Sequence, residues 1–235
     1  MGKGLRVVLT LMAVTLAGCG GSQGQRDARA AAKVRAEQAR VVAQQAGLGP
    51  DVQAFLARAA GASSLRYTVV YNQGAGQTTT VLADPPNRRI DVQGATGSDS
   101  LDRVLVKGTK SYVCHRGAGK WACQVGGTSG TTGPFTPDAI AQTIGSLVQL
   151  SDTYDFSVSG RRLLGLDASC LTADRKPARP STPQLGDHAA LCIAPNGVIL
   201  RLEGSGAPLA AVSYRPSVSG GAFDLPAKPS PPPTA

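Results

Sequence analysis

The chain of 235 residues contains few aromatic side chains, and this limits the ligands that it can recognise. Phenylalanine, tryptophan and tyrosine together make up 4% of the sequence, whereas 24 lysine and arginine residues outnumber 15 aspartate and glutamate residues. Proteins that bind nucleic acid combine basic patches with aromatic rings on which bases stack. The basic residues here are scattered along the chain, so the positive charge favours anionic lipid headgroups over nucleic acid as the partner.

The sequence also lacks two motifs that mark common enzyme classes. It contains neither a phosphate-binding Gly-x-x-x-x-Gly-Lys-Ser/Thr loop nor a zinc-binding His-Glu-x-x-His motif. We interpret His115 and His188 as surface residues. We interpret five aspartates near strand ends or on outward positions as solvated carboxylates: Asp91, Asp102, Asp152, Asp155 and Asp167. We therefore expect no enzymatic activity, no cofactor and no metal.

Long hydrophobic runs are missing as well. The apolar stretch from Val7 to Leu16 covers about ten residues, whereas a spanning helix needs roughly 20. Lys3 and Arg6 precede this stretch, and the small residues Ala17 and Gly18 follow it before Cys19. A basic start, a short apolar segment and a small-residue cleavage site are the features of a signal peptide.

The stretch Leu16-Ala17-Gly18-Cys19 has the form of a lipobox, at which the chain is cut and the new N-terminal cysteine is acylated. We therefore expect residues 1–18 to be removed and Cys19 to carry the lipid anchor, which places the protein on the extracytoplasmic face of the cell membrane. Two or three acyl chains hold a protein on a membrane almost permanently, because each buried CH₂ contributes about 0.8 kcal/mol. The alternatives are an ordinary cleaved signal peptide and a short buried apolar segment.

The remaining four cysteines, Cys114, Cys123, Cys170 and Cys192, are even in number, as in exported proteins with disulfides. Local spacing favours the pairs Cys114–Cys123 and Cys170–Cys192 among the three pairings that four cysteines allow. A zinc site is the alternative, but no Cys-x-x-Cys occurs and the two histidines do not have the spacing of zinc ligands.

The first cysteine pair lies in a predicted hairpin whose register can be counted. A turn centred on Ala118-Gly119 pairs residue 117 with 120, residue 116 with 121 and Cys114 with Cys123. This places the cysteines at a non-hydrogen-bonded pair, where the Cα atoms of an antiparallel ladder lie closest. Trp121 is then expected on the same side of the hairpin as Cys123.

The rest of the sequence predicts an α+β domain with one large, curved antiparallel sheet and helices on its concave side. Residues 19–48 are expected to form a lipid-anchored tether or stalk, either loosely helical or partly disordered, and residues 226–235 a proline-rich disordered tail. The domain between them, residues 49–225, is expected to hold a short helix from Pro50, an amphipathic helix from Pro137 to about Leu150 and about ten short strands.

The order of these features resembles a known family. The lipobox and charged stalk are followed by Pro85-Pro86-Asn87-Arg88-Arg89, Tyr112-Val113-Cys114, Trp121-Ala122-Cys123 and the helix start Phe135-Thr136-Pro137-Asp138. This arrangement resembles lipoproteins of high-GC actinobacteria and, more distantly, the LolA-like half-barrel carriers and the mycobacterial LppX and LprG lipoproteins. The resemblance implies an eleven-stranded half-barrel, closed by helices, whose apolar cavity holds acyl chains.

Two functions remain open from the sequence. The first is the binding or carrying of a lipid or other amphiphile in an apolar groove, and the second is a non-enzymatic interaction with another envelope protein, such as a transporter or a sensor. Strand parity and helix periodicity select the residues that would line the groove: Val70, Val81, Ile90, Val104, Val106, Ile144, Leu147, Phe156 and Leu200. Ordinary core packing is the alternative for each of them.

Overall fold

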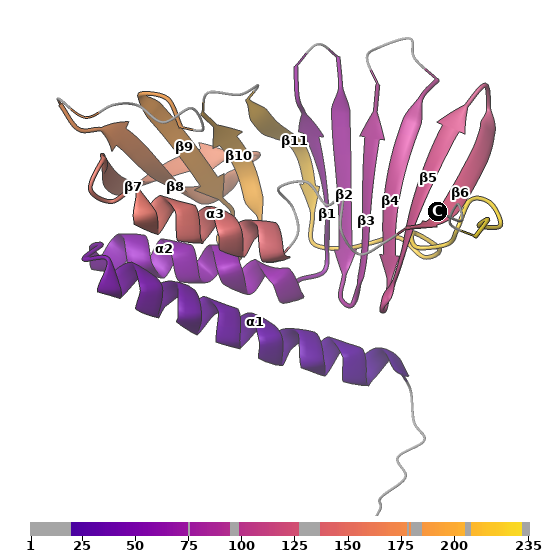
Figure 1. Ribbon diagram of the computed structural model, residues 1–235, viewed down its shortest axis with the longest axis horizontal. Helices are drawn as coiled ribbons and strands as arrows, with labels where there is room; N and C mark the ends of the chain where they lie inside the picture. Colours follow the sequence, from indigo (N-terminus) through magenta and orange to yellow (C-terminus); the bar gives the residue numbers. More distant parts are fainter. Residues whose placement is uncertain are drawn as a thin grey trace, which may run out of the picture.

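The computed structural model describes residues 20–74, 76–94, 99–126, 137–177, 179, 185–204 and 208–231. Cys19 and the expected signal peptide lie outside the described residues. Within these ranges the chain forms one open sheet of eleven strands, all paired antiparallel, with three α-helices beside it (Figure 1). The expectation of a single large antiparallel sheet is confirmed.

The strands follow one another along the sheet with a single long crossover. The order is β6-β5-β4-β3-β2-β1-β11-β10-β9-β8-β7, so β6 and β7 are the two edges. The strands are β1 (Tyr67–Asn72), β2 (Thr78–Asp84), β3 (Asn87–Gln93), β4 (Leu101–Lys107), β5 (Lys110–Gly117), β6 (Lys120–Gly126), β7 (Tyr154–Leu163), β8 (Leu166–Arg175), β9 (His188–Ile193), β10 (Ile199–Glu203) and β11 (Leu209–Arg215).

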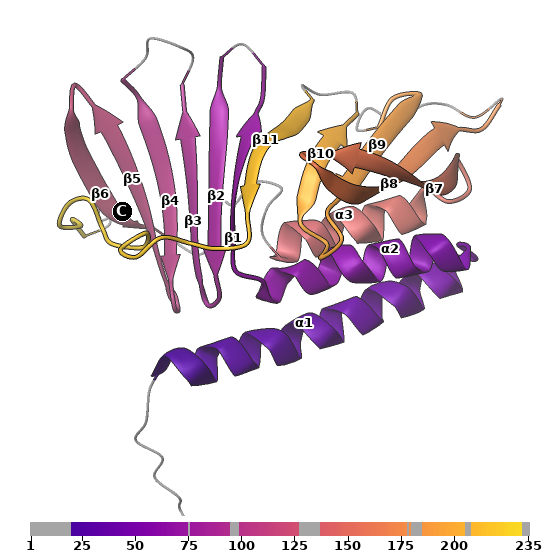
Figure 2. The ribbon, with the colours of Figure 1, turned by 180° about the vertical axis from the view of Figure 1, so that it is seen from behind.

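The sheet changes direction between its two halves. β7–β10 run across the direction of β1–β6, and β11 lies between the two halves (Figures 1 and 2). A register irregularity interrupts each of two ladders near this place, between Val70 and Tyr71 and between Ile199 and Arg201. Such irregularities bend a strand and increase its twist, which accounts for the curvature.

The two sides of the sheet differ in what covers them. On the inner face, Leu171, Leu191 and Ile193 pack against the helices, and Val69 and Val81 lie buried in a second cluster. The outer face carries the alternate residues of each strand, including both disulfides. In both views the two shorter helices lie beside β7–β10, the longest helix continues past them below the ends of β1–β3, and β5 and β6 lie beyond all three (Figures 1 and 2).

The helices are α1 (Gly20–Gln45), α2 (Pro50–Gly61) and α3 (Pro137–Gln149), with one 3₁₀ turn, η1 (Ala62–Ser64), after α2. Phe55 and Leu56 of α2 and Ile144 and Leu147 of α3 enter the same buried cluster as the inner face of β8 and β9. The two helices expected within the domain are therefore present. Among the described residues, no helix combines the length and apolar character needed to cross a membrane.

The first helix differs from the expected stalk. α1 runs along α2 as the outermost layer of the protein (Figure 1) and buries Ala32, Ala39 and Ala43. The absence of a continuous apolar stripe suggested a tether separate from the domain. Small side chains allow two helices to approach closely, so alanines suffice for this contact.

Both predicted disulfides are present, Cys114–Cys123 and Cys170–Cys192, each with its Cα atoms 4.0 Å apart. The predicted hairpin register is confirmed as well, since Gly117 pairs with Lys120, Arg116 with Trp121 and Cys114 with Cys123. Trp121 shares a face with Cys123, as expected from that register. The disulfides join β5 to β6 and β8 to β9, close to the two edges of the sheet.

The segment after β11 crosses the outer face of β1–β6 (Figure 2). Val218 and Ala222 pack on Leu82, and the carbonyl oxygen of Ala222 accepts a hydrogen bond from Arg89. We expected a disordered tail from residue 226, but Ser230 exchanges backbone hydrogen bonds with Cys123 and Val125 at the edge of the sheet. Ser230 therefore occupies one position along the edge of β6, which limits pairing with other chains at that point.

One close approach fixes the turn between β9 and β10 against α2. A Cβ atom added at Gly197, which has φ of +92°, would lie 2.2 Å from the carbonyl oxygen of Arg58. Gly108 has a similar backbone, with φ of +62°, but has nothing within 4 Å. Alanine substitutions at these two glycines therefore distinguish the stability lost to the backbone conformation from the stability lost to the steric clash.

We expect Gly108→Ala to lower the free energy of unfolding by about 1–2 kcal/mol through backbone strain alone. Gly197→Ala should cost at least about 2 kcal/mol more, because α2 and the turn must move apart. Chemical denaturation of the two variants measures the difference. Equal losses of stability would contradict the close packing of this turn on α2.

Candidate functional site

The inner face of β1–β5 carries a continuous apolar row. The ladder registers place Val69, Val81, Ile90, Val104 and Val113 side by side across five strands. The first three are buried, Val104 is partly exposed and Val113 is 39% exposed. The row therefore starts in the core and becomes progressively exposed beyond the helices.

Three further positions extend this exposed part into a surface. Val106 and Val92 lie on the same face as Val104, two residues along the chain or on the neighbouring strand, and both are partly exposed. We call Val92, Val104, Val106 and Val113 the valine strip. It is an apolar surface on the inner side of the sheet and is continuous with the core through Ile90.

The predicted groove residues divide among several places. Val81, Ile90 and Leu200 belong to the buried cluster between the two halves of the sheet. Ile144 and Leu147, with Phe156 packed against them, belong to the cluster under the helices. Val104 and Val106 lie on the valine strip.

The prediction for Val70 is wrong. Val69, not Val70, lies beside Val81 on the inner face, and Val70 pairs with Thr80 on the outer face. Both residues are apolar and β-branched, so composition did not distinguish the two possible parities of β1.

An arginine lies on the same inner face, at one end of the valine strip. Arg88 pairs with Ala83 on β2 and with Val106 on β4, and its exposed fraction is only 8%. Its Nη1 atom is buried and has no hydrogen-bond partner among the described residues. It borders a space of about 10 Å³. The other residues around this space are Ala62, Ser63, Tyr67, Tyr71, Gly197, Val198 and Ile199.

Two tyrosines beside Arg88 are held in the neutral form. Burial raises the pKa of Tyr67 and raises that of Tyr71 well above the usual value, and the nearby charge of Arg88 only partly offsets this effect. The hydroxyl of Tyr71 donates a hydrogen bond to the carbonyl oxygen of Ile199, at 2.7 Å. Neither phenol therefore supplies a negative charge to Arg88 near neutral pH.

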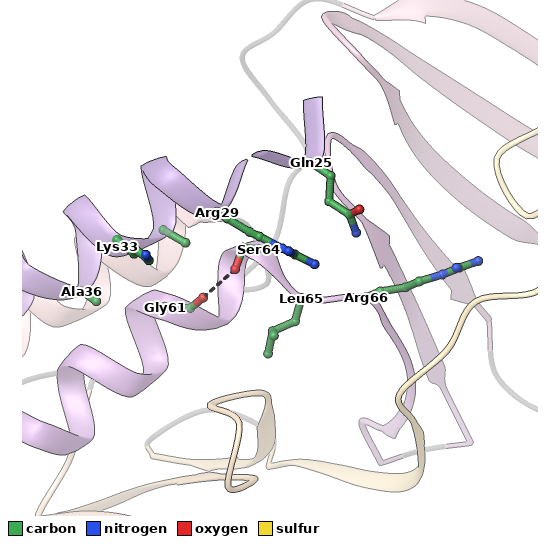
Figure 3. Close-up of a pocket in the computed structure, with 9 residues that line it drawn as sticks. Gln25, Arg29, Lys33, Ala36, Gly61, Ser64, Leu65 and Arg66 are labelled. Atoms are coloured by element: carbon green, nitrogen blue, oxygen red, sulfur yellow. Dashed lines mark hydrogen bonds between the residues drawn. The ribbon is translucent and has the colours of Figure 1, made fainter. Parts of the chain in front are cut away.

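A second hollow lies between α1 and the start of β1 (Figure 3). It has a volume of about 370 Å³ and brings together the cations Arg29, Lys33 and Arg66. Arg29 reaches across it toward Ser64, whereas Arg66 points away from the helices (Figure 3). Arg66 also forms an ion pair with Asp84. We call this hollow the basic groove, and the rest of its lining is Gln25, Ala32, Ala36, Gly61, Ser64 and Leu65.

The outer face of β3–β6 holds a buried ion cluster. Asp91 accepts hydrogen bonds from both Arg89 and Arg103, and the guanidinium of Arg103 lies 4.6 Å from the ring centre of Trp121. Burial by itself would raise the pKa of Asp91, but the hydrogen bonds from the two arginines outweigh it, so the pKa lies below the usual value. The interpretation of Asp91 as a solvated carboxylate is wrong, since its exposed fraction is 7%.

The sequence contained signals for both arginines that we did not use. Arg88 alternates with Ile90 and Val92, so the period of a strand places it on the inner face. Arg103 lies opposite Asp91 in the β3–β4 ladder, a pairing that depends on the register between two strands. His115 and His188 are exposed, and each bonds an aspartate on the neighbouring strand, Asp102 and Asp174.

Comparison with known proteins gives no family for this chain. No family model matches it, and no curated protein matches its sequence. The functional interpretation therefore depends on the geometry described above.

The ion cluster should make the stability of the protein depend on pH. Asp91→Asn should lower the free energy of unfolding at neutral pH by about 3 kcal/mol, because it leaves Arg89 and Arg103 without their counter-charge. A carboxyl whose pKa is lowered in the folded state stabilises the protein above its unfolded pKa, about 3.9, and loses this effect as the pH falls. The difference between wild type and variant should therefore shrink below about pH 4.

Denaturation of both proteins at a series of pH values measures this difference. Asp224→Asn is the control, because Asp224 is exposed and forms only a long ion pair with Lys107, at 4.0 Å. Exposed pairs of this kind contribute little, so the control should remain close to wild type. A difference between wild type and Asp91→Asn that does not change with pH would contradict the assignment.

Proposed function

We propose that this protein is a membrane-anchored lipoprotein that binds or carries a lipid or other amphiphile at the cell envelope. The observation that supports this most directly is the valine strip on the inner face of the sheet. It is apolar, partly exposed and continuous with the core, and α2 and α3 lie beside the other half of the sheet. The anchor is Cys19, acylated on the extracytoplasmic face of the membrane.

The physical basis of binding is the removal of apolar surface from water. Burial of apolar surface stabilises a complex by about 25 cal/mol per Å². An acyl chain lying along Val104, Val106 and Val113 would cover these side chains and continue toward Ile90. The eleven antiparallel strands agree with the strand number of a LolA-like half-barrel, and we propose that fold with the valine strip inside its cavity.

Native mass spectrometry of the exported protein tests this function, followed by organic extraction and lipid analysis of the same sample. A stoichiometric co-purified lipid is the expected result and would identify the class of amphiphile. If the protein is empty and also fails to bind added lipids, the proposal is wrong. The alternative function, interaction with another envelope protein through the same strip, would then account for the exposed valines.

The sheet offers a matched pair of variants for the same test. Val113 and Val125 lie on adjacent strands, are each 39% exposed and face opposite sides of the sheet. Val113→Glu should weaken amphiphile binding at least tenfold, because it places a charge on the valine strip. Val125→Glu should leave binding unchanged. Titration with a fluorescent fatty acid measures both, and equal effects would exclude the inner face as the site.

The basic groove supports a second element of the proposal, the orientation of the protein on the membrane. Gly20, the first residue of α1, follows Cys19 directly in the sequence. Consecutive Cα atoms are 3.8 Å apart, so acylation of Cys19 holds this end of α1 at the membrane surface. Arg29 and Lys33 lie in the third and fourth turns of this helix, about 14 and 20 Å from Gly20. We propose that α1 lies along the membrane surface, so that both cations meet anionic headgroups.

Reversal of these two charges should weaken binding to anionic vesicles. Each well-placed cation contributes about 1 kcal/mol, so Arg29→Glu with Lys33→Glu should reduce vesicle affinity at least tenfold. Lys110→Glu with Lys120→Glu changes the net charge equally, but at two exposed hairpin turns. Sedimentation of the mature chain with Cys19→Ser on phosphatidylglycerol vesicles compares them. Equal losses in both variants would mean that only net charge matters.

A further inference from the structure

Arg88 is a buried cation for which the described part of the chain provides no counter-charge. Its Nη1 atom has no hydrogen-bond partner there, and no described carboxylate forms an ion pair with it. Burial of a charged group is unfavourable unless the group is paired and hydrogen-bonded. An unpaired guanidinium inside the fold therefore points to a partner that is not part of the protein.

The comparison with Arg103 makes this contrast clear. Arg88 and Arg103 have the same exposed fraction, 8%, and lie on adjacent strands of the same sheet. On the outer face, Arg103 donates two hydrogen bonds to Asp91, at 2.8 and 3.0 Å. On the inner face, Arg88 faces Tyr67 and Tyr71, both of which remain neutral.

The space beside Arg88 limits the size of the missing partner. It measures about 10 Å³, which is the room occupied by a single water molecule or one oxygen atom. A whole sugar or a nucleotide does not fit, but one oxygen of a carboxylate or a phosphate does. Guanidinium groups bind such oxygens through charge-assisted hydrogen bonds.

We propose that Arg88 binds an oxygen of the anionic headgroup of an amphiphile whose apolar chain lies on the valine strip. The register places the backbone of Arg88 at the end of the strip, opposite Val106 and two residues from Ile90. The space beside its guanidinium is lined by residues of β1, η1 and the turn before β10. A headgroup oxygen in this space would place the start of the apolar chain at Arg88, from which the chain would run past Val106 onto the strip. This inference rests on the proposed function and narrows the ligand to acidic amphiphiles.

The test compares amphiphiles that share their chains and differ in charge. Dipalmitoyl phosphatidic acid is compared with dipalmitoylglycerol, and palmitate with hexadecanol, for wild type, Arg88→Met and Arg88→Lys. The protein is the mature chain with Cys19→Ser, exported so that both disulfides form. Wild type should bind each acidic amphiphile about 10- to 100-fold more tightly than its neutral counterpart, the usual effect of a charged hydrogen bond.

Arg88→Met should lower the affinity for the acidic amphiphile to that for the neutral one, and its affinity for the neutral one should change little. Arg88→Lys should retain part of the preference, since it keeps the positive charge. If wild type binds acidic and neutral amphiphiles equally, and Arg88→Met changes neither, this inference is overturned and the proposed function stands. If no amphiphile binds, the proposed function itself fails.

Inorganic phosphate and acetate, added without an amphiphile, distinguish a lipid headgroup from a free anion. If they bind wild type but not Arg88→Met, and no preference for acidic amphiphiles exists, Arg88 holds a free anion and the lipid assignment is wrong. Competition of phosphate with phosphatidic acid is measured on the wild type and needs no variant. This measurement therefore still tests the inference if a substitution prevents folding.

Thermal unfolding of the lipid-free protein gives an independent measure. Replacement of an unpaired buried cation by an apolar side chain of similar length should leave Tm unchanged or raise it. Arg103→Met is the matched comparison and should lower Tm, because it leaves Asp91 with one arginine fewer. A comparable fall in Tm for Arg88→Met would assign Arg88 a structural role and contradict the inference.

Discussion

The sheet is wider than the helices that pack on it, and most other features of the protein follow from this difference. Strands lie about 4.8 Å apart, so eleven of them span about 48 Å. The two helices that pack on the sheet, α2 with 12 residues and α3 with 13, are only about 18 and 20 Å long. α1 does not even lie on the sheet, since it packs on α2 as an outer layer. The inner face of β3–β5 therefore keeps apolar side chains that are only partly buried.

The two faces of the sheet differ in whether their buried charges are compensated by opposite charges. On the outer face, Asp91 lies between Arg89 and Arg103, so each buried charge has a partner. On the inner face, Arg88 is buried to the same extent beside neutral tyrosines. Because the two arginines lie on adjacent strands, a general tolerance of unpaired charge in this fold does not explain the contrast. The uncompensated arginine lies on the face that carries the valine strip, and the compensated one lies on the opposite face.

Local patterns were sufficient to predict much of the fold from the sequence. The hairpin around Cys114 and Cys123 was predicted to the residue, because a two-residue turn fixes every pair that follows it. The helix from Pro137 was predicted from its apolar periodicity. Val70 was misplaced because two adjacent valines give no parity, and parity then depends on the partner strand.

Long-range packing was beyond these local patterns. α1 has an alanine contact face, and small side chains carry little periodic signal, so its docking on α2 could not be anticipated. The position of Ser230 beside β6 depends on the path of the whole C-terminal segment across the outer face. The ion cluster required the register of β3 with β4, which joins residues twelve positions apart. In each case the missing information is a contact between elements rather than a property of one element.

The disulfides and the buried ion cluster lie on the side of the sheet away from the valine strip, whereas the exposed contact between His115 and Asp102 lies beside the strip. Both disulfides, the Asp91 cluster and the C-terminal segment lie on the outer face, and they hold the strand pairs near both edges. Loops of this length, closed by a disulfide, contribute about 3 kcal/mol each, mainly by restricting the unfolded chain. Such restraints stabilise an incompletely covered sheet without filling its inner side. When the strands are held together from the outer face, the apolar surface on the inner face can be covered either by water or by a ligand. A carrier that must both bind and release an amphiphile needs such a surface.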